Sequence, residues 1–135
     1  MIDELCDLLR RQAEAATHLE RRLRALELVV AAGEQRFVPF ALDEVETASE
    51  QLAALELTRT LALSTAGLPV DVSARDLVSG VSDPVAALRL YSVVSTLETA
   101  TDRLFEARER ARNVVLRGAE GNQQRLMAAN EFASH

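Results

Sequence analysis

The chain has 135 residues and a net charge of −6, with 48% hydrophobic residues, 4% aromatic residues and no tryptophan. This length predicts one domain with an aliphatic core, and the acidic balance argues against a general affinity for nucleic acid, which needs an extended positive surface. No apolar run is long enough to span a bilayer, and the first residues, MIDELCDLL, are acidic where a secretory signal is basic, so we expect a cytoplasmic protein without membrane insertion.

A heptad repeat occupies the first thirty residues. Its positions are separated alternately by three and four residues, and we call such a stripe the seam of a helix: Ile2, Leu5, Leu9, Gln12, Ala16, Leu19, Leu23, Leu26 and Val30. Only Gln12 is polar. A repeat of this kind keeps one stripe facing a partner helix, as in coiled coils. It predicts a helix over about residues 2–32, which Gly33 ends.

A second helix is predicted over about residues 39–66. It starts near Pro39, which fits a first helical turn but not a helix interior, and stops before Gly67. Its seam has small residues and one arginine: Ala41, Val45, Ala48, Leu52, Leu55, Arg59 and Ala62. Additional leucines widen the apolar face and indicate more than one neighbour: Leu42, Leu57, Leu61 and Leu63.

Residues 67–83 are rich in helix breakers and are predicted to connect two helices. Within them, Ser73 and Asp76 have the spacing of a helix cap, which predicts one or two helical turns before Gly80. The pair Asp83 and Pro84 then signals the start of a last long helix, over about residues 84–117. Its seam is Leu90, Val93, Leu97, Ala100, Leu104, Ala107, Ala111 and Val114.

Three long helices with matched seams predict an all-α fold, in which residues 1–117 form an elongated antiparallel three-helix bundle with coiled-coil-like packing. We interpret Gly118 and Gly121 as a helix end or hinge. Residues 118–135 are then either a flexible tail or a short amphipathic C-terminal helix. In both cases three large apolar residues are not needed for packing among the three helices, whose seams already cover one another: Leu126, Met127 and Phe132. These residues are therefore available to contact a partner.

Arginines are concentrated before this tail. Residues 103–117 contain five arginines and two glutamates, a local charge of +3: Arg103, Arg108, Arg110, Arg112 and Arg117, with Glu106 and Glu109 between them. Cations near a helix C-terminus compensate the helix dipole, and we interpret these arginines as helix-end compensation that can also select an acidic partner.

Residue types that carry catalysis are few. The histidines His18 and His135 and the single cysteine, Cys6, form no nucleophile and base pair and no metal-ligand spacing. The segment GAEG at 118–121 lacks the spacing of a nucleotide loop. We therefore expect no enzyme activity, no catalytic or metal-binding residues and no cofactor.

Three segments together resemble the FlgN-type flagellar export chaperones in their order and spacing. IDELCDLLRRQAEAATHLERRLRALELVVAAG is similar to the first helix of that family, and QLAALELTRTLAL resembles its second helix. LRLYSVVSTLETATDRLFEARERARNVVL resembles its last long helix, including Asn113 followed by apolar residues.

The resemblance implies a cytoplasmic chaperone that binds the C-terminal helices of hook-associated proteins, prevents their premature assembly and delivers them to the flagellar type III export gate. It also implies that the C-terminal part carries the substrate contact, for which we predict Asn113, Val114, Val115, Leu116, Arg117, Leu126, Met127 and Phe132. Such a chaperone acts as a monomer or weak homodimer. The alternative is a self-associating coiled-coil scaffold or adaptor, in which the surplus apolar positions meet a second copy.

Overall fold

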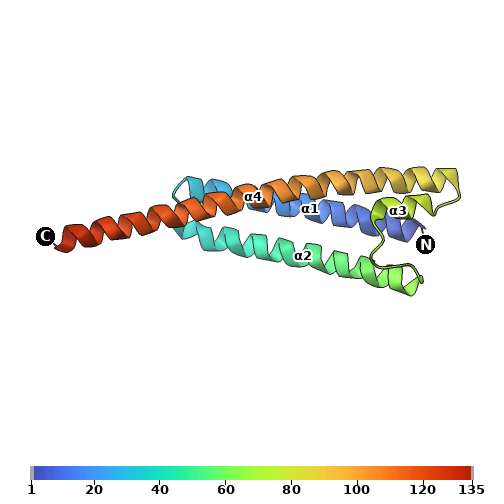
Figure 1. Ribbon diagram of the computed structural model, residues 1–135, viewed down its shortest axis with the longest axis horizontal. Helices are drawn as coiled ribbons and strands as arrows, with labels where there is room; N and C mark the ends of the chain where they lie inside the picture. The colour runs from blue at the N-terminus through green and yellow to red at the C-terminus, as the bar shows by residue number, and fades with distance from the viewer. Residues whose placement is uncertain (1, 135) are drawn as a thin grey trace.

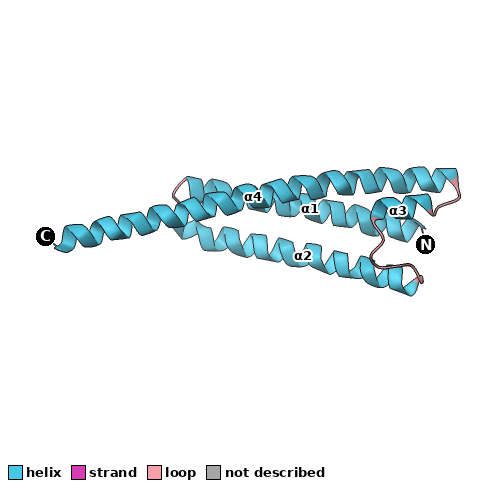
Figure 2. Cartoon of the chain, in the orientation of Figure 1, coloured by secondary structure: helices cyan, strands magenta, loops and turns pink. Residues whose placement is uncertain are grey.

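The structure is a computed structural model that describes the backbone of residues 2–134, with the side chains up to Gly121 and those of Met127 and Ala128. Throughout these residues the regular elements are helical (Figure 2). In chain order they are α1 (Ile2–Ala31), the 3₁₀ helix η1 (Gln35–Phe37), α2 (Val38–Thr65), α3 (Ala74–Ser79) and α4 (Pro84–Ser134). The all-α fold is confirmed.

The long helices form an elongated bundle in which α2 runs antiparallel to both α1 and α4 (Figure 1). α1 packs along α4 and along α2, whereas no close backbone approach joins α2 to α4 within the described residues. The register of the parallel pair holds along its length, because Asp3 binds Arg89 near one end and Val30 lies beside Gly118 near the other. α1 is therefore the central helix on which the other two are assembled.

The predicted seams form most of the core. In α1 the seam is buried from Leu5 to Leu26, and in α4 the buried seam residues are Leu90, Leu97, Ala100, Leu104, Ala107 and Ala111. The prediction is wrong at Val93, which is half-buried, whereas the neighbouring Val94 is buried. In α2 the prediction holds at Ala41, Ala48 and Leu52 but is wrong at its end, where Leu63 is buried in place of Ala62. A straight helix drifts by about 20° per heptad from a 3.5-residue repeat, so after three heptads Ala62 has rotated away from the core.

α4 does not end at Arg117, and that predicted boundary is wrong. The helix continues through Gly118 and Gly121 to Ser134, so residues 118–134 extend α4 rather than forming a separate element. Glycine inside a helix costs about 1 kcal/mol relative to alanine, but it keeps its backbone N–H and does not interrupt the hydrogen bonds as proline does. With 51 residues, α4 is about 77 Å long.

Glycine ends both α1 and α2 in the same way. Gly33 and Gly67 have φ angles of 75° and 74°, in the left-handed region that glycine adopts without strain. The residue after each glycine donates its backbone N–H to the carbonyl five residues earlier, Glu34 to Val29 at 3.2 Å and Leu68 to Leu63 at 2.9 Å. These are Schellman motifs, and the helix end predicted at Gly33 is confirmed.

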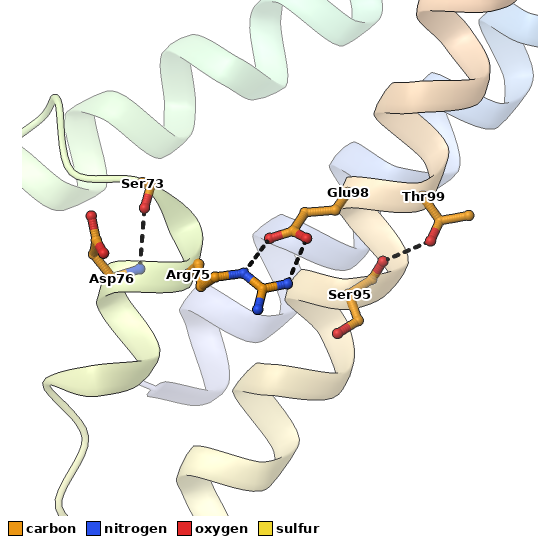
Figure 3. Close-up of polar contacts among 6 residues, drawn as sticks. All are labelled: Ser73, Arg75, Asp76, Ser95, Glu98 and Thr99. Carbon is orange, nitrogen blue, oxygen red and sulfur yellow. Dashed lines mark hydrogen bonds and ion pairs between the residues drawn. The ribbon is translucent and has the colours of Figure 1, made fainter.

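α3 is capped and fastened as Figure 3 shows. The Ser73 hydroxyl accepts a hydrogen bond from the Asp76 backbone N–H at 3.2 Å, which confirms the predicted cap. Arg75 donates two hydrogen bonds to the Glu98 carboxylate on α4, at 3.2 and 2.8 Å. These bonds hold the pKa of Glu98 below its ordinary value and raise the pKa of the Arg75 guanidinium. α3 thereby ties the connection between α2 and α4 to the side of α4.

Candidate functional site

The C-terminal part of α4 projects beyond the turn that joins α1 to α2 (Figure 1). α1 ends at Ala31, and Gly118 marks the level at which the two helices separate. A Cβ atom at Gly118 would lie 3.0 Å from Cγ1 of Val30, whereas a Cβ atom at Gly121 would meet nothing within 4 Å. Gly118 therefore permits the close approach of α4 to the last turn of α1, and Gly121 already stands clear of it.

A groove of about 400 Å³ lies at the base of this projection and is open to solvent. We call it the base groove. Its lining comes from the end of α1 with the following turn, from the start of α2 and from α4: Val29, Val30, Ala31, Gly33, Glu34, Gln35, Val38, Val115, Arg117, Gly118, Ala119 and Gly121. Nine of these residues are Val, Ala or Gly, and the polar side chains are those of Glu34, Gln35 and Arg117, so the groove can accept an aliphatic or aromatic side chain against a mainly apolar lining.

Two of the predicted partner-binding residues, Val115 and Arg117, line the base groove. Leu116 follows the groove-lining Val115 and is 51% exposed, so it offers a large apolar side chain with no covering neighbour. Asn113 is exposed but is not part of the groove lining. Val114 is half-buried at a seam position, where it contributes to packing more than to a free surface.

The other predicted residues lie further along the projection. Met127 is 59% exposed, which agrees with a role in contact with a partner. The side chains of Leu126 and Phe132 lie outside the described residues, although their backbones belong to α4. The structure therefore brings Val115 and Arg117 together at the groove and separates them from Met127 along one helix.

The opposite wall of the groove was not predicted. Val30 was predicted as the last seam position of the first helix, Val29 was given no role, and Val38 precedes the predicted start of the second helix near Pro39, although all three line the groove. In the sequence, Val29 and Val30 form an apolar pair that only two alanines separate from Gly33. The position of Gly118 could also be read from the sequence, because Ala111, Val114, Gly118 and Gly121 continue the seam at intervals of three and four residues. Gly118 thus occupies a packing position, and Gly121 continues the stripe beyond the end of α1.

The arginines beside the groove are uncompensated. Arg108, Arg110, Arg112 and Arg117 are exposed, and within the described part of the chain none of them forms an ion pair. Other arginines do form ion pairs, as in exposed Arg89 with Asp3 at 2.8 Å and half-buried Arg22 with Glu44 at 2.9 Å. The surface of α4 around the base groove therefore combines free positive charge with exposed apolar side chains.

This combination suits the recognition of an amphipathic helix. The apolar stripe of such a helix can bury itself against α4, and acidic residues at its border can pair with the free arginines. Among the described residues, no group of three or more His, Cys, Asp or Glu side chains is placed to hold a metal ion.

Comparison with family models, with curated proteins and with solved structures gave no match. Over the described residues, none of the helices is both long enough and apolar enough to cross a membrane.

Proposed function

We propose that the protein is a cytoplasmic flagellar export chaperone of the FlgN type, which binds the C-terminal helices of hook-associated proteins, prevents their premature assembly and delivers them to the type III export gate. The observation that carries this proposal is the projection of α4 beyond the bundle, with exposed Leu116 and Met127 and with arginines at its base that form no ion pair to any described residue. The resemblance of the three helical segments to that family supplies the identity of the partner.

In the proposed complex the partner helix lies along the C-terminal part of α4 and inserts one apolar side chain into the base groove. Full burial of a leucine-sized side chain contributes about 1.5–3 kcal/mol, so a helix that covers Leu116, Met127 and the groove gains enough to offset part of the entropy of association. Arg112 and Arg117 then favour partners with acidic residues at the border of the apolar stripe. The partner is held as a single helix and cannot assemble with other subunits through the same stripe.

The proposal is tested by calorimetric titration of the full chain with the purified C-terminal helical region of a hook-associated protein from the same organism. We expect a 1:1 complex. A chain that ends at Arg117 should lose the interaction, and Leu116→Ser should weaken it by about tenfold or more, the effect of about 1.4 kcal/mol. Leu88→Ser is the matched control, because Leu88 is an exposed leucine near the start of the same helix, at the end of α4 away from the base groove, and it should leave the affinity unchanged.

Charge provides a second measurement on the same complex. Replacement of Arg112 and Arg117 by glutamine should slow association and reduce its dependence on salt, because exposed charges act mainly on the encounter of the two molecules. The proposed site would be contradicted if the chain that ends at Arg117 bound the hook-associated region with full affinity and if Leu116→Ser left that affinity unchanged.

Self-association is the second candidate function, and one observation favours it. Leu57 and Leu61 lie one helical turn apart on α2 and are 60% and 59% exposed, which is the arrangement that a coiled-coil contact with a second copy would use. Sedimentation over a wide concentration range separates the two functions. A monomer at every concentration excludes the scaffold, whereas a stable dimer that Leu57→Ser and Leu61→Ser dissociate supports it.

A further inference from the structure

The two halves of α2 are attached to the bundle very differently. Ala41, Ala48 and Leu52 are buried in the first half, whereas in residues 53–65 only Leu63 is buried. The ion pair that joins α2 to α1 within the described residues, Arg22 with Glu44, is also in the first half. Residues 53–65 are therefore held by little apolar contact and by no ion pair to α1 or α4 in the described part of the chain.

A polar layer interrupts the core at this level. Gln12 of α1 and Arg59 of α2 both occupy seam positions, and both line one groove of about 660 Å³ between α2 and α4, together with Asp102 of α4. Gln12 is only 7% exposed, and its Oε1 atom accepts no hydrogen bond from any described residue. A buried acceptor without a donor opposes the closed arrangement, since that atom would be hydrated if α2 moved away.

Three threonines of the same segment hydrogen-bond back to the helix. Thr58, Thr60 and Thr65 each donate the hydroxyl hydrogen bond to the carbonyl four residues earlier, at 2.9, 3.1 and 2.8 Å. Threonine bonds of this kind slightly destabilise or bend a helix. They therefore act against a straight helix between Leu52 and the end of α2.

Both ends of the segment are anchored. Leu52 is 5% exposed and holds the preceding part of α2 in the core, while Arg75 fastens α3 to Glu98 after the connection. We propose that the C-terminal half of α2, residues 53–65, opens from the bundle as a unit while α1 and α4 stay packed, and that the polar layer of Gln12 and Arg59 sets how often it opens. When residues 53–65 open, they uncover the groove between α2 and α4, and we call this segment the gate.

Hydrogen exchange of the full chain tests the gate directly. Amides of residues 53–65 should exchange at least about tenfold faster than those of residues 41–52, because local opening frees the former without unfolding the latter. In the Gln12→Leu/Arg59→Leu variant this difference should shrink to about threefold or less, since leucine removes the unpartnered groups and adds apolar contact. The matched control is Arg21→Leu/Gln51→Leu, which alters one exposed residue on each of the same helices and should leave the difference as it is.

Cys6 separates local opening from global unfolding. Its buried thiol lies on the side of α1 that faces α4, where it shares a pocket with Arg89, Ser92 and Val93. If the proposal holds, a thiol reagent labels Cys6 only at the rate at which the whole chain unfolds. This rate is well below the rate of amide exchange in residues 53–65. Three results would each overturn the gate. The first is an equal exchange rate of the amides along the whole of α2, and the second is an unchanged difference between its two halves in the Gln12→Leu/Arg59→Leu variant. The third is labelling of Cys6 at the rate at which residues 53–65 open. If the double variant does not fold, Gln12→Leu alone supplies the same comparison.

Discussion

Gly118 and Gly121 form a matched pair inside one helix, and replacing each by alanine separates helix propensity from packing. Both substitutions gain about 0.8–1.0 kcal/mol in helix propensity, because alanine loses less backbone entropy than glycine on folding. Only the new methyl group at Gly118 meets a neighbour, Cγ1 of Val30 at 3.0 Å, while the one at Gly121 meets nothing within 4 Å. The two variants should therefore differ in the sign or size of their effect on the free energy of unfolding.

The opposing cost at Gly118 follows from that distance. Two carbon atoms pack best about 3.5–4.0 Å apart, so Val30 must retreat by a few tenths of an ångström. Valine is stiff about χ1 in a helix, and the movement falls on the last turn of α1. Overpacking of this kind costs about 1–3 kcal/mol. Gly118→Ala should then lie between neutral and about 2 kcal/mol destabilising, whereas Gly121→Ala should stabilise by about 0.5–1 kcal/mol.

Urea unfolding followed by circular dichroism measures both values, and the helical signal of the native state reports any gain in α4 itself. A Gly118→Ala/Val30→Ala variant completes a double-mutant cycle, in which the smaller side chain at Val30 should relieve the crowding by about 1 kcal/mol of coupling. Two results would contradict a contact between Gly118 and Val30: a Gly118→Ala variant that is stabilised as much as Gly121→Ala, or a cycle without coupling between the two positions.

Core burial and the ion pair of α3 give further predictions. Leu19→Ala should lower the free energy of unfolding in urea by about 2–5 kcal/mol, because Leu19 is fully buried. Leu28→Ala, at a position that is 59% exposed, should lower it by no more than about 0.5 kcal/mol. Similar losses in the two variants would contradict the assignment of the seam. The folded-state pKa of Glu98 is lowered by Arg75, so the stability from this pair is present above the ordinary value of 4.5 and is lost as the pH falls through the lowered pKa. Urea midpoints measured from neutral to strongly acidic pH should therefore fall more for the native chain than for Glu98→Gln, and parallel curves would show that the pair contributes nothing.

Much of the fold follows from local pattern. The intervals of three and four residues located the buried stripes of α1 and α4, because the position of a side chain around a helix depends only on its distance along the chain. The cap at Ser73 and the helix end at Gly33 were also predictable, since each rests on a few neighbouring residues. Leu63 was missed because a seam of small residues in α2 does not pin the helix to a 3.5-residue repeat, and the buried side then drifts.

The candidate site was predictable in part. Met127 could be selected as a residue that three filled seams leave over, whereas Val115 and Arg117 were selected from the family resemblance. The structure leaves all three accessible along α4. The wall of Val29, Val30 and Val38 could not be selected in this way, because it exists only where the end of α1 and the start of α2 meet α4. The sequence likewise could not predict that Arg108, Arg110 and Arg112 form no ion pair with the described residues, because pairing depends on which carboxylates lie on neighbouring helices.

The order of residue types along the chain is enough to predict three long helices, most of the buried positions on them and the excess of apolar and positive residues near the C-terminus. Packing between the helices is needed to show that α4 passes through both glycines, that Gly118 lies against Val30 and that α2 is held tightly in one half and loosely in the other. The reason is physical. A glycine, a buried glutamine or an arginine has no fixed effect of its own, because its contribution depends on the distance and chemistry of neighbours that lie far away in the chain.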